Sequence, residues 1–273
     1  MQVKCELRLR MMSAAAALGA MIAGAGHAPA QQTSTPAPAP SISLQTYTAP
    51  DQSATVGVPA GWKVTKAQNA VIQISGPQGE TVSLGNAVMV KNGPYSPGQK
   101  PVGPISLSIP YQATLADKYA VIWKEAAAQA GDPTQTVTPI SNTPIPLGNI
   151  AQCAVFLGSE SNKTGSFNFE TRFCSLPMDT NGIYKLFWIG GTIPVALATQ
   201  ERATLEAVLN SYAPSTASLK LILQPSTPPI APPGMGGVSS TMYGEQMADE
   251  TANCMDLGVI RQEPEWKLPP YCR

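Results

Sequence analysis

Two cysteines on either side of a polar turn place the strongest constraint on the fold of this chain. Cys153 lies in the apolar run Ala151–Leu157 and Cys174 lies in Phe167–Ser175, at similar distances from the turn Ser161–Gly165. If the two runs form a β-hairpin, the cysteines face each other across the strands, within reach of a disulfide. The spacing therefore predicts a hairpin of defined register.

The first thirty residues have the three-part layout of a secretory signal peptide. Three basic residues precede an uncharged stretch from Met11 to Gly26, and Ala28-Pro29-Ala30 supplies the small residues that a signal peptidase reads. The apolar run is shorter than the ~20 residues that a membrane-spanning helix needs. We expect cleavage between Ala30 and Gln31, which predicts a periplasmic or secreted protein without a membrane span.

Cleavage leaves four cysteines, and an even number in an exported chain indicates two disulfides. Three pairings are possible. The hairpin favours Cys153 with Cys174, and Cys254 and Cys272 then close a loop in the C-terminal tail. The alternative is a redox-active dithiol, and the absence of a C-x-x-C spacing argues against it.

Histidine chemistry is excluded, because the single histidine, His27, leaves with the signal peptide. A mature chain without histidine cannot run a Ser-His-Asp or Cys-His relay, and it cannot hold a metal through imidazole. Three of the 17 basic residues and one of the 17 acidic residues also leave, so 14 and 16 remain. A weakly acidic chain without basic clusters predicts no nucleic-acid partner.

Composition divides the chain after the signal peptide of residues 1–30 into four segments. A Pro/Ala-rich linker (31–43) precedes a domain (44–213), a Pro/Gly-rich linker (214–242) and a short cysteine-containing tail (243–273). Besides the cysteine hairpin, the domain has expected strands at Ser53–Val58, Trp62–Thr65, Ala70–Ser75, Thr81–Leu84, Ala87–Val90, Gln135–Thr138 and Ile183–Ile189, the last ended by Gly190-Gly191.

Two helices are expected, at Tyr111–Ala130 and at about Thr199–Tyr212, where apolar residues recur at helical spacing. Polar residues that include Lys118 and Lys124 occupy the other face of the first helix. Strands that pair as consecutive hairpins, together with two covering helices, predict the α+β class with a mostly antiparallel sheet.

The start of the domain resembles PsbP-like (Mog1/PsbP) domains, in which the first strand ends in Pro-x-Gly-Trp and a hairpin follows. Here Thr46–Pro50 leads into Val56–Val64, which contains Pro59-Ala60-Gly61-Trp62, and the resemblance covers Leu44 to Ala213. It implies an α/β/α sandwich in an exported bacterial member. It also implies a non-enzymatic accessory role, since one plant branch supports the oxygen-evolving photosystem and one eukaryotic branch binds a small GTPase.

The tail is too small to hold a core alone, so we expect a disulfide-tied loop or lid on the domain. Trp266 and Tyr271, held between prolines, are candidate anchors for a partner. The alternative is that both side chains pack back onto the surface of the domain.

The sequence contains no nucleophile-elbow, P-loop, S-x-x-K or H-E-x-x-H motif, so no catalytic residue, cofactor or metal site is predicted. The main hypothesis is an exported, non-enzymatic binding protein of the bacterial envelope. One alternative is a histidine-independent enzyme that uses carboxylates such as Glu160, Glu170 and Asp179. Another is a periplasmic carrier that binds a small ligand on the sheet face opposite the helices.

Overall fold

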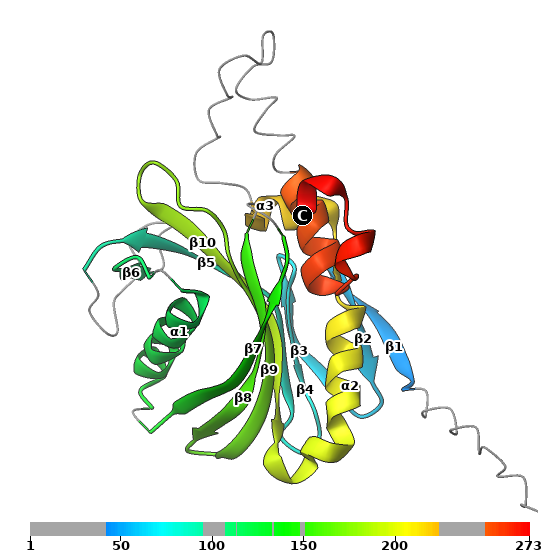
Figure 1. The fold of residues 1–273 in the computed structure, drawn as a ribbon. Coiled ribbons are helices and arrows are strands. Elements are labelled where there is room, and N and C mark those ends of the chain that lie inside the picture. The colour runs from blue at the N-terminus through cyan, green and yellow to red at the C-terminus, as the bar shows by residue number, and fades with distance from the viewer. Residues whose placement is uncertain (1–41, 95–106, 113, 133, 148–150, 224–248) are drawn as a thin grey trace, which may run out of the picture. The chain divides into compact units, whose positions relative to one another are not determined.

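An eight-stranded sheet organises the protein in a computed structural model, which describes residues 42–94, 107–112, 114–132, 134–147, 151–223 and 249–273 (Figure 1). The signal peptide with its cleavage site, and most of both linkers, lie outside these residues. The strands in spatial order are β3 (Lys63–Gln68), β4 (Val71–Ser75), β5 (Thr81–Asn92), β10 (Ile183–Pro194), β9 (Gly165–Ser175), β8 (Gln152–Asn162) and β7 (Thr136–Ile145). All these neighbours pair antiparallel, and β6 (Leu107–Ile109) adds a parallel pairing to β5.

Strands β8 and β9 form a long hairpin around the turn that the sequence indicates. Cys153 lies opposite Cys174 in the register of the pair, and a disulfide joins them. Because side chains alternate between the two faces of a strand, this register also places Arg172 on the same face of β9 as Cys174. The hairpin therefore directs a charged side chain to the disulfide face.

Helices cover both faces of the large sheet (Figure 1). Helix α1 (Leu115–Ala130) lies on one face, and α2 (Ala198–Ser211) lies on the other with the C-terminal segment. Helix α1 is capped by Thr114 and begins at Leu115, four residues after the expected start at Tyr111, and Gly131 in a left-handed conformation caps its end. The hypothesis of a ligand on a sheet face free of helices is therefore wrong.

A second, three-stranded sheet packs beside α2. It consists of β1 (Leu44–Thr48), β2 (Ala54–Pro59) and β11 (Ala213–Pro214). The backbone N–H of Gly57 donates to Ser211 Oγ over 2.8 Å, and Tyr212 donates from its hydroxyl to the carbonyl of Ala70 over 2.7 Å. These bonds join β2 and the turn between β3 and β4 to the end of α2.

The large sheet separates two hydrophobic cores. The core under α1 is aromatic, and the ring of Tyr119 stacks on Phe156 with centroids 4.4 Å apart. The core on the other face contains the stripe Leu205, Val208 and Leu209 of α2 together with the C-terminal segment. Such packed faces supply most of the stability of helices of this length.

Two strands continue through positions where the sequence predicts an end. Strand β5 spans both expected strands and passes through Gly85, whose φ of 69° suits glycine and where a Cβ would collide with the carbonyl oxygen of Ala70. Strand β10 runs past Gly190-Gly191 to Pro194, so the expected end is wrong. A Cβ at Gly191 would collide with Leu205 of α2, which shows that this glycine permits close packing.

Helix α3 (Thr216–Leu223) lies at the start of the segment predicted as a linker. Its residue Leu219 is buried in the core on the α2 face, which corrects the start of that linker. The predicted α+β class, the mostly antiparallel sheet with two main helices and the disulfide-tied tail are confirmed. Among the described helices, none has the length and apolar character to cross a bilayer.

Candidate functional site

The C-terminal segment is helical and is closed by a disulfide between Cys254 and Cys272. Its elements are an α-helical stretch at 249–254, the π-helical turn η2 (Met255–Ile260) and the 3-10 turns η3 (Glu265–Lys267) and η4 (Pro270–Cys272). Both cysteines are fully buried. The disulfide therefore closes the segment into a loop whose two ends are fixed to each other.

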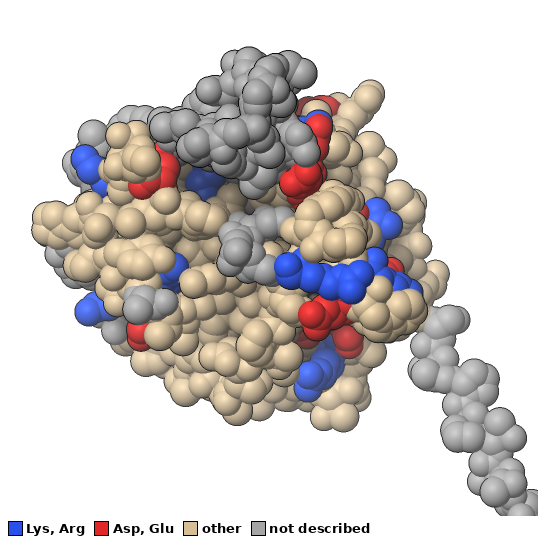
Figure 2. All heavy atoms as spheres, turned by 45° about the horizontal axis from the view of Figure 1, so that its top comes forward, with Lys and Arg blue, Asp and Glu red and all other residues tan. Residues whose placement is uncertain are grey.

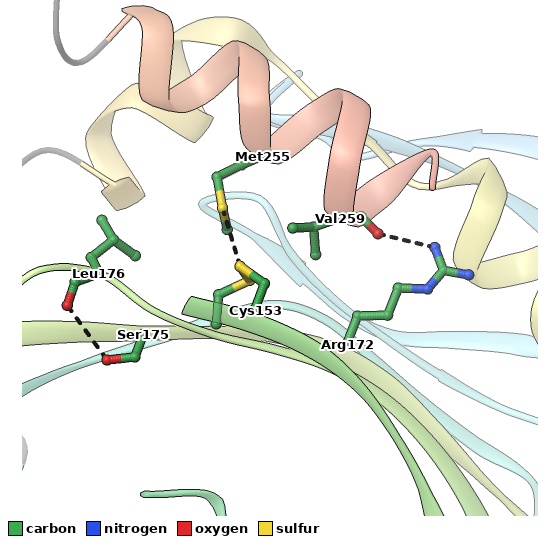
Figure 3. The surroundings of a disulfide bond; sticks show 7 residues. Cys153, Arg172, Ser175, Leu176, Met255 and Val259 are labelled. Atoms are coloured by element: carbon green, nitrogen blue, oxygen red, sulfur yellow. Dashed lines mark hydrogen bonds between the residues drawn. A yellow bond between two sulfur atoms is a disulfide. The ribbon is translucent and has the colours of Figure 1, made fainter. Parts of the chain in front are cut away.

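This segment covers the disulfide of the β8–β9 hairpin (Figure 3). Met255 Sδ lies 3.9 Å from Cys153 Sγ, which is a van der Waals contact because neither sulfur carries a hydrogen. Met255, Val259 and Leu268 are all buried in the same core. The segment is thus anchored by apolar packing over a rigid cross-link.

Arg172 of β9 adds a polar anchor beneath the segment (Figure 3). Its side chain is fully buried and donates from Nη1 to the carbonyls of Val259 and Ile260, the first over 3.3 Å. Its Nη2 donates to Asn210 Oδ1 of α2 over 2.6 Å and lies 3.6 Å from Glu170 Oε1. One guanidinium therefore joins the sheet, α2 and the C-terminal segment.

Burial acts in opposite directions on the two charged groups of this anchor. Desolvation raises the pKa of Glu170, although the nearby Arg172 charge opposes the shift. Desolvation also lowers the pKa of Arg172, against the opposing charge of Glu170. A guanidinium still stays protonated in a protein, so Arg172 keeps all its donors.

The three candidate carboxylates of the enzyme hypothesis do not meet. Glu170 pairs with Arg172 on the disulfide face. Glu160 accepts hydrogen bonds from the side chains of Gln135 and of Asn162 in the hairpin turn. Its charge contributes to the raised pKa of Tyr119 on the α1 face. Asp179 accepts backbone N–H groups of the β9–β10 turn. The described residues also contain no group of three or more His, Cys, Asp or Glu placed to hold a metal ion.

Trp266 and Tyr271 lie on the outside of the anchored segment. Trp266 is 73% exposed and Tyr271 is 45% exposed, so the alternative that both pack back onto the surface of the domain fails for Trp266. Tyr271 is held by a 2.6 Å hydrogen bond from Asn253 Nδ2 to its hydroxyl. Lys267 Nζ lies 5.4 Å from the centre of the Trp266 ring.

Charges around this surface are mixed in sign. Lys267 pairs with Glu263 and Arg261 pairs with Asp256, each over 2.9 Å. Figure 2 brings the top of Figure 1, where the C-terminal segment lies, toward the viewer, and basic and acidic side chains appear side by side in small groups. The surface therefore offers an exposed indole among charges that compensate each other.

A groove of about 380 Å³ runs between α1 and the edge strand β7. It is lined by Tyr119, Ala120, Trp123, Lys124, Ala127, Ala128, Gln135, Val137 and Pro139. The lining contains one lysine and no carboxylate. Its chemistry suits an apolar ligand better than it suits acid–base catalysis.

Sequence reasoning missed both Arg172 and the groove. The sequence did contain a signal for Arg172: it is a charged residue in the predicted strand Phe167–Ser175, two positions before Cys174, and residues two apart lie on the same face of a strand. The groove had none, because it depends on how far α1 lies from β7 in the folded protein.

No family model and no curated protein matches the chain. Three solved structures are similar to this chain, and they differ in sequence identity, TM-score and coverage. The cyanobacterial PsbP (CyanoP) of Synechocystis has 12% identity and a TM-score of 0.36, and the alignment covers 67% of this chain and 98% of that one. The Ran-binding protein Mog1p of Saccharomyces cerevisiae has 7% identity and a TM-score of 0.32, covering 63% and 95%. A Bacteroides thetaiotaomicron protein has 10% identity and a TM-score of 0.26, covering 82% and 80%. The PsbP/Mog1 likeness concerns the fold, and at these identities it transfers no partner or activity.

Proposed function

We propose that this chain is an exported, non-enzymatic accessory protein that docks on a larger protein of the cell envelope through the surface around Trp266. The observation that carries the proposal is an indole that is 73% exposed on a segment anchored by a disulfide, by a buried core and by Arg172. Large exposed aromatic residues are costly to leave in water and are enriched at the centres of interfaces.

Rigidity supports this role. A side chain on a mobile tail must lose conformational freedom when it binds, whereas one on a fixed backbone has already lost most of it. Trp266 lies in a 3-10 turn that starts after Pro264, and Leu268 just beyond it is buried. The exposed indole is thus presented by backbone that is fixed on both sides.

In-situ cross-linking in the native cells tests the proposal. A photo-reactive amino acid at position 266 should capture one envelope protein in stoichiometric yield, and the same residue at position 140 should not. Ile140 is a suitable control because it is 76% exposed but belongs to the edge strand β7 and not to the C-terminal segment. Trp266→Ala should weaken binding to the identified partner by at least ~30-fold, as expected for an interface hot spot.

The control Ile140→Ala should leave that affinity unchanged. Equal capture from both positions, or unchanged binding by Trp266→Ala, would refute docking through this surface. Export is tested separately by the intact mass of the mature protein, which should begin at Gln31. A mass that retains the first thirty residues would contradict export by cleavage.

A small-ligand carrier is a second candidate, favoured by the groove between α1 and β7 and by its lack of carboxylates. Native mass spectrometry of the exported protein should then show a copurifying small molecule. Ala128→Phe, at an exposed lining position, should displace that molecule without disturbing the core. An unliganded wild-type protein would count against this function.

A further inference from the structure

A buried lysine lies where the start of α1 meets the large sheet. Lys118 belongs to the polar face that the helical pattern indicates, yet it is only 1% exposed. Its Nζ lies 3.0 Å from Ser175 Oγ at the end of β9 and 3.3 Å from Gln152 Oε1 at the start of β8. The first turn of α1 therefore packs its lysine against the ends of two strands.

Two tyrosine rings complete the surroundings of this lysine. Lys118 Nζ lies 4.6 Å from the ring centre of Tyr111 and 5.5 Å from that of Tyr184, and 3.5 Å from the Tyr111 hydroxyl. The two rings meet edge to face with centres 5.6 Å apart. Cation–π contacts of this kind stabilise a desolvated ammonium group in part.

No carboxylate in the part of the chain that the structure describes forms an ion pair with this ammonium group. The neighbours of its Nζ are instead neutral oxygens and aromatic rings. The nearest acid along the helix, Asp117, is exposed and bonds to the Thr114 cap. A buried charge without a partner is costly, so natural proteins pair such groups or use them.

A second polar group, the hydroxyl of Tyr184, belongs to one of the two rings that Lys118 faces. This hydroxyl is buried and has no hydrogen-bond partner among the described residues, although buried hydroxyls are nearly always satisfied. Burial, with a smaller contribution from Tyr111, raises the pKa of Tyr184 to about 12. Tyr184 therefore remains a neutral hydrogen-bond donor under physiological conditions.

We infer that Lys118, Ser175 and Tyr184 form a binding site for a small oxyanion, of the carboxylate or the phosphate and sulfate class. Lys118 and Tyr184 can donate hydrogen bonds to such a ligand, and Lys118 supplies the positive charge that it requires. The hydroxyl of Ser175 accepts from Lys118 and bonds to the carbonyl of Leu176 over a long 3.4 Å, so it would turn from that carbonyl to donate to the ligand. Access is from the side of Tyr111 and Gln152, because both residues reach the surface. The site lies apart from the surface around Trp266 and adds to the docking function.

Titration of the mature protein with anions tests this inference. Sodium acetate, phosphate and sulfate are added at constant ionic strength, with chloride as the reference, and the unfolding temperature is followed. Wild-type protein should show a saturable rise in unfolding temperature with acetate or with phosphate and sulfate, and the responding class identifies the ligand chemistry. Lys118→Met should abolish the rise, and Tyr184→Phe should weaken the apparent affinity about fivefold, as expected for one hydrogen bond.

Lys124→Met is the matched control, since it removes an exposed lysine of the same helix. It should leave the titration unchanged. Calorimetric titration of the same anions into wild-type protein and Tyr184→Phe provides a reading that does not depend on the stability of the lysine variant. The inference is overturned if no oxyanion exceeds chloride, or if a rise persists in Lys118→Met as an unsaturable, adventitious ion effect.

Discussion

Replacing Arg172 by methionine removes the guanidinium that joins the sheet to the C-terminal segment while it keeps most of the apolar volume. The carbonyls of Val259 and Ile260 and the side chain of Asn210 then lose their donor. Removing one partner of a buried charged network costs about 3–5 kcal/mol. The unpaired Nε disappears with the side chain, which offsets part of the loss, so we expect destabilisation near the lower end, about 3 kcal/mol.

Urea unfolding of the mature protein measures this change. With a dependence of free energy on urea of 1–3 kcal/mol per molar, the midpoint should fall by at least about 1 M. Trypsin should also cut the variant faster at Arg261 and Lys267, because the segment opens before the domain unfolds. Arg202→Met, an exposed arginine of α2, is the matched control and should change stability by less than about 0.5 kcal/mol. A loss below 1 kcal/mol with unchanged cleavage would show that Arg172 does not hold the segment.

Two further perturbations probe the N-terminal turn and the second disulfide. Hydrogen bonds from Ser53 and from the backbone N–H of Asn69 hold the pKa of Asp51 below its ordinary value of 3.8. The Asp51 carboxylate therefore stabilises the fold above pH 3.8, and this contribution is lost as the pH falls through the lowered pKa. Asp51→Asn should therefore have a lower urea midpoint than wild type at neutral pH, and a gap that persists well below pH 3.8 would contradict this linkage. Replacing Cys254 and Cys272 by serine opens a loop with a sequence separation of 18 residues. This change should lower the free energy of unfolding by about 3 kcal/mol. A urea midpoint equal to that of wild type would be inconsistent with a stabilising cross-link.

The β8–β9 hairpin was predictable because its evidence is local. A turn, two apolar runs and a cysteine in each run specify which residues face each other, and the structure has Cys153 opposite Cys174. The helices were predictable for a similar reason, since spacing of apolar residues within one segment indicates the buried face. In α1 the spacing identified the helix but placed Lys118 on the exposed polar face, whereas the structure buries it.

The candidate sites were harder to predict because they join distant segments. The anion site combines Lys118 of α1 with Ser175 and Tyr184 of two strands, and no spacing in the sequence relates these residues. Gly191 misled for a related reason: glycine is typical of a strand end, but here it lets β10 approach α2. In each case the deciding contact comes from tertiary packing.

The position of the hairpin disulfide beneath the C-terminal segment sets an order for maturation. Cys153 and Cys174 lie under Met255 and its neighbours, where an oxidoreductase cannot reach them once the segment has docked. Their thiols must therefore be oxidised while the end of the chain is still free. They also come earlier in the chain than Cys254 and Cys272, so synthesis in the N-to-C direction offers the correct partners first. If the first thirty residues are cleaved as proposed, a chain delayed before this oxidation would present four thiols at once and three ways to join them.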